Sequence, residues 1–142
     1  MKIYSQDFEN GAPIPREFGY RNDNISPHIA WETIPTGTKS LALLCNDPDA
    51  PVGNWIHWVI HSIEPSVTEI PKGGPVPGKE LKNDFGSNGW GGPAPPSGTH
   101  RYFFTLFALD IPELEGVSTK DFEKRCKEHT IEKAQFMGTF SK

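Results

Sequence analysis

Cysteines, long apolar runs and clusters of basic residues are all scarce in this sequence of 142 residues. The two cysteines, Cys45 and Cys126, are too few for a disulfide framework and lack the spacing of a zinc site. No apolar run approaches the ~20 residues that a membrane-spanning helix needs. Residues 1–10 also lack the apolar stretch of a secretory signal. These absences predict a reduced, cytoplasmic protein without integral membrane association.

The charge of the chain makes several partners unexpected. Eighteen acidic residues outnumber fourteen lysines and arginines, which gives a formal net charge of −4. The basic residues are scattered and do not form a stripe interleaved with aromatic residues. We therefore expect no surface that binds nucleic acid or an anionic membrane.

Apolar runs separated by turn residues dominate what is present. Fourteen glycines and fourteen prolines punctuate the chain. Three apolar runs lack the 3.6-residue period of a helix, namely residues 40–46, 55–60 and 102–109. Such runs, bounded by turn residues, are typical of central strands covered on both faces, although helix is the alternative for each. Shorter strands are expected at residues 3–5, 29–31 and 136–140.

Helices are expected only late in the chain. Ser118 and Asp121 have the spacing of a capping box, which predicts an amphipathic helix from about residue 119 to residue 127. A second short helical turn is expected between residues 129 and 135. With the strands, this predicts one domain over residues 1–142, a mainly β sandwich with one or two short peripheral helices.

Ionisable side chains lie on all three central runs. Strand alternation places Asp47 on one face with Leu41, Leu43 and Cys45. It places His57 with Trp55, Val59 and His61, and His100 with Tyr102, Phe104 and Leu106. Burying a lone carboxylate or imidazole costs several kcal/mol unless the group is paired. We therefore expect Asp47, His57 and His100 to meet in one pocket.

A glycine-rich loop lies between the second and third runs. Residues 86–98 include five glycines, and such a loop can turn backbone N–H groups toward an anion. We expect Gly92 N–H, His57 and His100 to donate to a phosphate monoester or carboxylate. Asp47 is expected to fix an imidazole tautomer, or to accept from a protonated phosphate oxygen or an amine. Aromatic residues are expected at the apolar rim: Trp55, Trp90 and Tyr102.

Three motifs in this order resemble the phosphatidylethanolamine-binding protein family. They are Asp-Pro-Asp-Ala-Pro at 47–51, Trp-x-His at 55–57 and Gly-Thr-His-Arg-Tyr at 98–102. Residues 24–31 and 133–139 resemble the bacterial and archaeal branch, so the resemblance spans nearly the whole chain. It implies a Greek-key antiparallel β-sandwich with a small anion-accepting pocket at one end.

The resemblance also implies particular residues and contacts. By motif, the pocket residues fall on the following positions: Asp47, His57 and His100, with Trp55, Gly92 and Tyr102 beside them. The resemblance implies cis peptide bonds at Ala50–Pro51 and Gly53–Asn54. From prokaryotic members it implies a homodimer.

The leading functional hypothesis is a non-enzymatic binding protein with a preformed pocket. Its ligand would be small and anionic, bearing phosphate or carboxylate, with no cofactor, and the protein would regulate a partner protein. The alternative is an inhibitor of a serine protease or a kinase. A less favoured third hypothesis is a metal-dependent hydrolase that uses Asp47, His57 and His100.

Structural roles compete with these hypotheses. Asp47 before Pro48 is also typical of an Asx turn, and His57 is also typical of a satisfied core histidine. Asp49 is expected to pair with Arg101 rather than to contact a ligand. The remaining histidines are expected to be structural or exposed: His28, His61 and His129.

Overall fold

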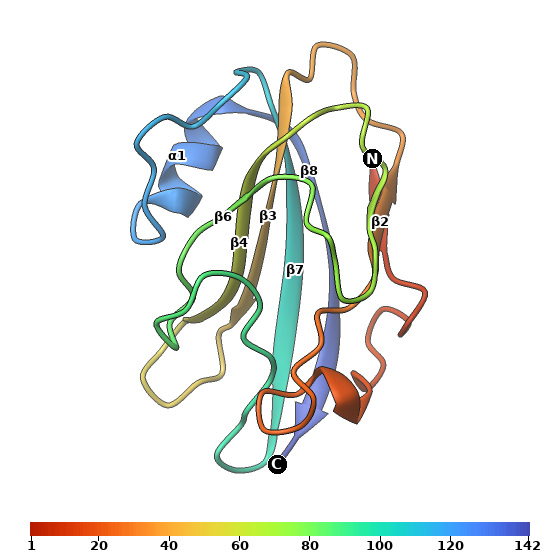
Figure 1. Ribbon diagram of the computed structural model, residues 1–142, viewed down its shortest axis with the longest axis vertical. Helices are drawn as coiled ribbons and strands as arrows, with labels where there is room; N and C mark the ends of the chain where they lie inside the picture. Colours follow the sequence, from red (N-terminus) through yellow and green to blue (C-terminus); the bar gives the residue numbers. More distant parts are fainter.

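Two antiparallel β-sheets pack against each other in the computed structural model, which describes residues 1–142 (Figure 1). The smaller sheet has the order β1-β2-β5, with β1 Lys2–Tyr4, β2 Ile29–Glu32 and β5 Glu69–Ile70. The larger sheet has the order β6-β4-β3-β7-β8, with β6 Lys79–Glu80, β4 Trp55–Ile63, β3 Ser40–Asp47, β7 Thr99–Leu109 and β8 Thr130–Ser141. A 3-10 helix, Arg16–Phe18, and one α-helix, α1 Phe122–His129, complete the fold. The predicted mainly β sandwich is confirmed.

Strand β3 lies at the centre of the larger sheet and is buried on both faces, as its apolar run predicts. Leu41, Leu43 and Cys45 belong to the core between the two sheets. Ala42 and Leu44 face the other way and pack in a smaller cluster with Phe122 and Cys126 of α1. The sheet therefore has a sandwich side and a helix side.

The start of α1 lies three residues later than the capping-box spacing suggests. Ser118 donates its backbone N–H and its hydroxyl to the Asp121 carboxylate at 2.8 and 3.0 Å. The predicted pair therefore meets, but it closes a turn, and the helix begins at Phe122. Phe122 and Cys126 lie on the buried face of the helix.

The predicted helical turn between residues 129 and 135 is wrong. From Thr130 onward these residues belong to β8, which pairs with β7 along its whole length. Gln135 lies opposite Thr105 and donates to its hydroxyl at 2.8 Å. Residues 132–135 have good helix formers in their sequence, but ladder hydrogen bonds to β7 override that weak local preference.

The two cis peptide bonds implied by the resemblance are also absent. Ala50–Pro51 and Gly53–Asn54 are trans, and the cis bond of the chain lies at Gly74–Pro75. The Gly53 N–H donates to the Ala50 carbonyl at 2.9 Å. This bond puts Pro51 in the second position of a β-turn, where the fixed φ of proline suits an ordinary trans bond.

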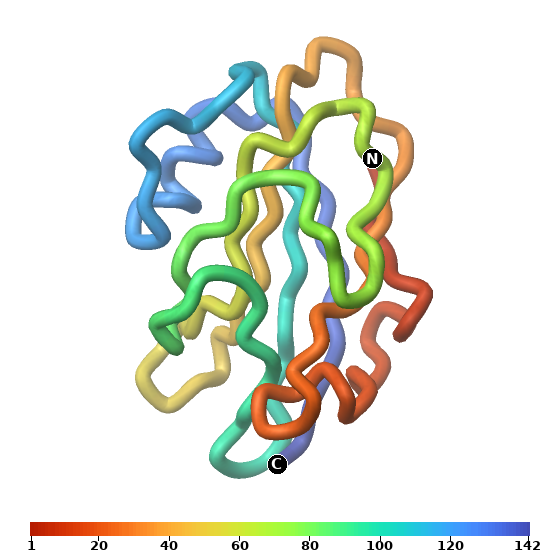
Figure 2. The backbone as a smooth tube through the Cα atoms, in the orientation of Figure 1, coloured from red at the N-terminus to blue at the C-terminus, as the bar shows by residue number.

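Loops gather at one end of the sandwich, beside the C-terminus (Figure 2). They are the β3–β4 loop, the segment before β7, and the segment after the 3-10 helix. Asp47 ends β3, Trp55 begins β4 and His100 is the second residue of β7, so the sequence motifs meet at this end. No helix of the chain has both the length and the apolar character to cross a membrane.

Candidate functional site

A cavity of about 410 Å³ opens at this end of the sandwich. Its polar lining consists of Asp47, His57, His100 and Tyr102, together with Arg21. The first four side chains are almost inaccessible, with residues 3%, 2%, 7% and 0% exposed. Four of the six residues predicted for the site therefore meet at a common floor, and a fifth, Trp55, lines the wall.

Asp47 and His100 form a buried pair at this floor. The His100 Nδ1 lies 2.7 Å from the Asp47 Oδ2. The other carboxylate oxygen accepts the Asp49 backbone N–H at 2.7 Å. Asp47 therefore has both roles that the sequence suggests, because it closes an Asx turn with one oxygen and holds a pocket imidazole with the other.

Asp49 pairs with Arg101, as predicted, and stays outside the cavity lining. The guanidinium donates to both carboxylate oxygens at 2.8 and 2.9 Å, and the Arg101 backbone N–H adds a third bond at 3.0 Å. The hydrogen bonds from Arg101 lower the pKa of Asp49 to about 2. This pair ties the β3–β4 loop to β7, which keeps Asp47 beside His100.

His57 reaches the floor through a β-bulge, so the predicted alternation along β4 holds for Trp55 and His57 but is wrong at Val59. Cys45 lies opposite Trp58, but the next residue of β3, Asn46, lies opposite Ile56. His57 is therefore the extra residue of the bulge. Beyond it, Val59 points to the helix side of the sheet, while the His57 ring packs edge-on against Tyr102 at 5.1 Å. The bulge separates side chains that strict alternation would place together.

The tautomer of His57 is fixed by a backbone carbonyl. Its Nδ1 lies 2.5 Å from the Gly91 oxygen, and a carbonyl can only accept, so Nδ1 carries the hydrogen. Burial lowers the pKa of His57 below its ordinary value. The ring is therefore neutral at pH 7, and its Nε2 is a bare acceptor with no partner in the protein.

Tyr102 contributes a hydroxyl without a hydrogen-bonding partner. It is the one fully buried side-chain oxygen or nitrogen in the molecule that lacks a partner. Burial, together with the nearby Asp47 carboxylate, raises the pKa of Tyr102, so the hydroxyl keeps its proton. An unpartnered buried polar group costs free energy, which a ligand oxygen at the cavity floor would recover.

Gly92 does not offer its N–H to the cavity, contrary to expectation. That N–H donates to the Asn24 side-chain oxygen at 2.8 Å, and the Gly91 N–H donates to the His57 carbonyl at 2.9 Å. A Cβ at Gly92 would lie 1.9 Å from the Phe18 carbonyl oxygen. Glycine is needed at position 92 for close backbone packing, and neither of these two N–H groups is available to an anion.

Trp90, predicted at the rim, is half-buried and packs against the core. Its ring packs against Trp58 and Phe104 at 5.2 and 6.1 Å. Its Nε1–H donates to the Phe18 carbonyl at 3.1 Å. An apolar rim exists nonetheless, and it combines Trp55, as predicted, with side chains that were not predicted.

Sequence reasoning missed most of the cavity mouth. Tyr20 and Phe85 stack in parallel with ring centres 3.9 Å apart, and the Trp55 ring lies edge-on to Phe85 at 5.5 Å. Val52, at the tip of the β3–β4 loop, is 77% exposed. Tyr20, Val52 and Phe85 lie in loops without periodicity, so no local signal identifies them. Asn24, which accepts the Gly92 N–H, could have been found from the sequence, since it begins one of the segments that resemble the family.

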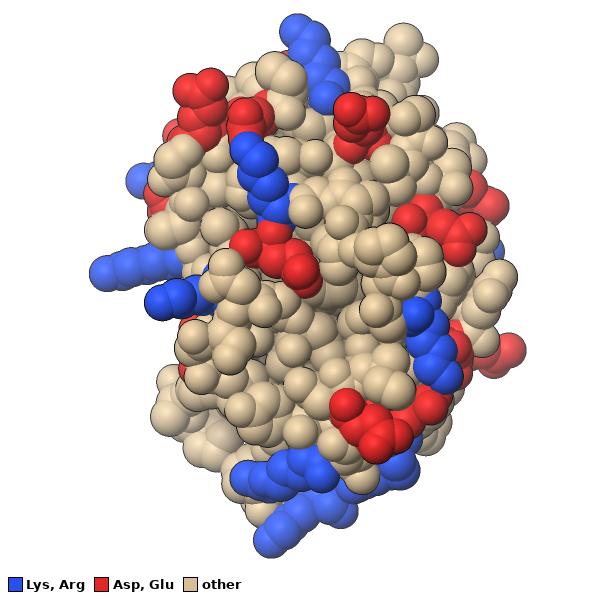
Figure 3. Space-filling model, viewed as in Figure 1, with Lys and Arg blue, Asp and Glu red and all other residues tan.

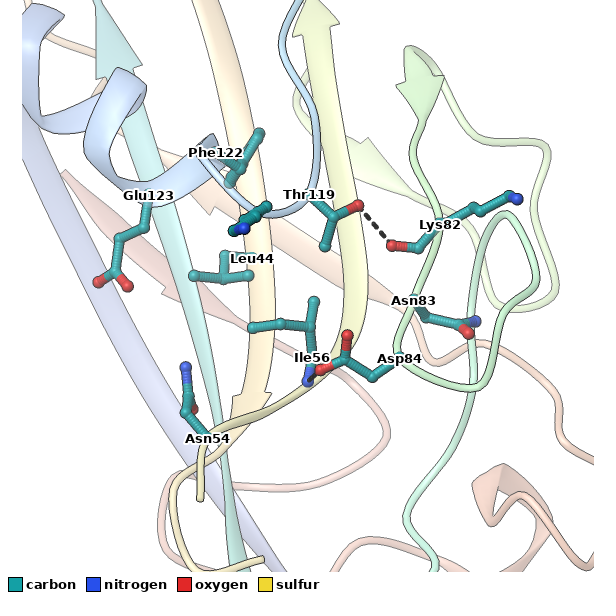
Figure 4. Close-up of a pocket in the computed structure, with 10 residues that line it drawn as sticks. Leu44, Asn54, Ile56, Lys82, Asn83, Asp84, Thr119, Phe122 and Glu123 are labelled. Carbon is teal, nitrogen blue, oxygen red and sulfur yellow. Dashed lines mark hydrogen bonds between the residues drawn. The ribbon is translucent and has the colours of Figure 1, made fainter. Parts of the chain in front are cut away.

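A second hollow, of about 440 Å³, lies on the helix side of the sheet (Figure 4). Two of its polar side chains are already bonded within the protein. Asp84 accepts the Ile56 N–H at 2.7 Å, and the Thr119 hydroxyl donates to the Lys82 carbonyl. The Lys82 ammonium points away from the hollow (Figure 4). The unpartnered acceptors and the unpartnered hydroxyl lie in the first cavity, which we therefore take as the candidate site.

Comparisons with known proteins agree with the fold. The family model described as phosphatidylethanolamine-binding protein matches residues 4–141. A UPF0098 protein of Aquifex aeolicus is 41% identical over 152 residues, which cover 100% of this chain and 89% of the relative. Two crystal structures are similar over 99% of this chain. A putative phosphatidylethanolamine-binding protein homolog of Chlamydia trachomatis has a TM-score of 0.91 with 34% identity and 97% of its chain covered. Escherichia coli YbcL, described as a member of the mammalian family, has a TM-score of 0.93 with 27% identity and 98% covered.

Proposed function

Because the chain belongs to the phosphatidylethanolamine-binding protein family, we propose that it binds a small anionic ligand in the cavity floored by Asp47, His57, His100 and Tyr102. The ligand carries a phosphate or a carboxylate group. The protein binds this ligand without changing it chemically and thereby regulates a partner protein.

The unpartnered Tyr102 hydroxyl is the observation that supports this proposal best. Folding has buried a donor at the floor of a cavity and left it without an acceptor. The Nε2 atoms of His57 and His100 also have no partner in the protein, and neither is fully buried. A cavity with three unsatisfied polar groups is suited to a ligand with several oxygens.

The charge at this end of the molecule favours an anion. Arg21 lines the mouth of the cavity, and a smaller neighbouring hollow is lined by Arg16, Arg21 and Lys142. Blue side chains gather at the same end in Figure 3. The chain as a whole is acidic, so this concentration of basic groups creates a local field that attracts anions.

The lining of the cavity supports binding rather than covalent catalysis. No serine, threonine, cysteine or lysine lines it, so none of these four nucleophiles reaches the floor. No three His, Cys, Asp or Glu side chains are arranged to hold a metal ion. Inhibition of a serine protease or a kinase, the homodimer and the cytoplasmic location remain predictions from the sequence.

Inorganic phosphate and phenyl phosphate are the probes that test the proposal. Each is expected to raise the melting temperature saturably and to shift the NMR signals of the His57 and His100 rings. The double variant Asp47→Ala with His100→Ala should lose both effects. Lys120→Ala, in the hollow on the helix side, is the matched control and should retain them. An absence of any saturable effect, or an equal effect in the double variant, would contradict the proposal.

A further inference from the structure

The cavity floor presents an acceptor, the His57 Nε2, that no donor of the protein satisfies. His57 gives its Nδ1 hydrogen to Gly91, so its Nε2 carries a lone pair. His100 directs Nδ1 toward the Asp47 carboxylate, and its Nε2 has no partner in the protein. The buried Asp47 carboxylate adds a negative charge to the same floor.

Donors are few by comparison. The N–H groups of Gly91 and Gly92 are used within the protein, and Pro96 has none. The Tyr102 hydroxyl is the unpartnered side-chain donor at the floor, the Ala94 backbone N–H lies near that hydroxyl, and the Arg21 guanidinium lies at the mouth. A fully deprotonated oxyanion would therefore set its own lone pairs against the His57 Nε2 and the Asp47 carboxylate.

We propose that the site selects an oxyanion that brings its own proton, such as a phosphate monoester in its monoanionic form, and rejects a sulfate monoester of the same shape. The acidic O–H of the ligand donates to the His57 Nε2. The Tyr102 hydroxyl donates to a second ligand oxygen, and the remaining charge lies toward Arg21. This inference rests on the proposed function and adds a substrate class to it.

His57 is the acceptor because its Nε2 has no other partner. Both oxygens of Asp47 already accept hydrogen bonds, from Asp49 N–H and from His100. The charged and titratable groups around the His57 ring come from several elements: Asp47 on β3, His100 and Tyr102 on β7, Asp84 before β7, and Arg21 in the loop after the 3-10 helix.

An ammonium group would also satisfy these acceptors, but the structure favours the protonated anion. Arg21 lies at the mouth and would repel a cation on its way in. Because the protonated oxygen of the ligand faces the floor, the negative charge of the ligand lies away from the Asp47 carboxylate. The aromatic mouth formed by Tyr20, Phe85 and Trp55 suits a flat apolar group next to the anion.

Phenyl phosphate and phenyl sulfate give a matched pair of probes. The phosphate monoanion and the sulfate have the same charge and nearly the same shape, and they differ in one acidic hydrogen. By calorimetry at about pH 6, phenyl phosphate should bind about a hundredfold more tightly, as expected where a buried acceptor loses its donor. Its affinity should fall about tenfold per pH unit above ~6, where phosphate monoesters lose their second proton.

Equal affinity for the two esters would overturn the inference and leave anion binding intact. Tighter binding of phenethylamine than of phenyl phosphate would assign the acceptors to a cation and would also overturn it. Failure of both esters to bind would instead contradict the proposed function itself.

A pair of histidine variants assigns the selectivity to one ring. Gln at position 57 can turn its NH₂ group to the cavity, so His57→Gln should lower the phosphate-to-sulfate affinity ratio at least about tenfold. His61→Gln, on the same strand but outside the cavity lining, is the control and should keep the ratio. An unchanged ratio in a His57→Gln variant that retains the wild-type NMR dispersion would contradict the assignment.

Discussion

Removing the Tyr102 hydroxyl should stabilise the ligand-free protein, which is the reverse of the usual effect of Tyr→Phe in a core. The side chain is completely buried and its oxygen has no partner. A buried unpartnered polar group costs about 1–3 kcal/mol. Tyr102→Phe keeps the ring and removes only that cost, so we expect the free energy of unfolding to rise by about 1 kcal/mol. For a chain of this length, that change raises the melting temperature by about 3 °C.

Equilibrium urea unfolding at neutral pH without phosphate measures this change, and an unchanged m-value shows that the unfolding reaction is the same. Tyr20→Phe, at the exposed mouth of the same cavity, is the control and should leave stability unchanged. With phosphate present, Tyr102→Phe should show a smaller ligand-induced rise in melting temperature than the wild type. A loss of about 1 kcal/mol in the ligand-free variant would mean that the hydroxyl is bonded in the free protein. The reasoning on the cavity floor would then be refuted.

Three further predictions concern the residues that frame the cavity. Gly92→Ala places a methyl group 1.9 Å from a backbone carbonyl oxygen, so urea unfolding should show that the free energy of unfolding falls by more than ~3 kcal/mol. Gly53→Ala is the control, because the space around Gly53 is open, and it should cost about 1 kcal/mol. Arg101→Ala should lower the free energy of unfolding only slightly at neutral pH, because the pair with Asp49 is partly exposed to solvent. That difference should shrink as pH falls from ~3.9 toward about 2, since the low pKa of Asp49 stabilises the fold only while the carboxylate is ionised. Burial lowers the pKa of His57, so protonation of this ring favours the unfolded chain and thermal stability should fall as pH drops below ~6.5. An equally steep fall in His57→Gln would contradict this.

The central strands could be predicted because burial on both faces leaves a strong composition signal. Residues 40–46 are apolar at successive positions, which fits a strand with the sandwich core on one side and α1 on the other. Strand β7 shows the same pattern and places His100, Tyr102 and Phe104 on one face, as alternation predicts. The convergence of Asp47 with His100 follows, because β3 and β7 are direct neighbours.

The edge strand and the loops could not be predicted because their conformation depends on distant partners. Residues 132–135 are mostly exposed and polar, so only the pairing with β7 makes them strand. The sequence around Gly92 does not show that its N–H is used within the protein, because the acceptor, Asn24, is 68 residues away. The stack of Tyr20 on Phe85 joins two loops that have no periodicity at all.

The bulge at His57 explains why the site is built from β4 at all. Alternation without a bulge would put His57 on the same face as Val59, which packs on the helix side of the sheet. The imidazole would then lie away from Tyr102, and the Gly91 carbonyl would have no N–H to accept. With the bulge, both His57 and Trp58 face the sandwich side, where Trp58 fills the core and His57 closes the cavity floor. One extra residue in β4 therefore lets a single strand supply a core side chain and a binding side chain at successive positions.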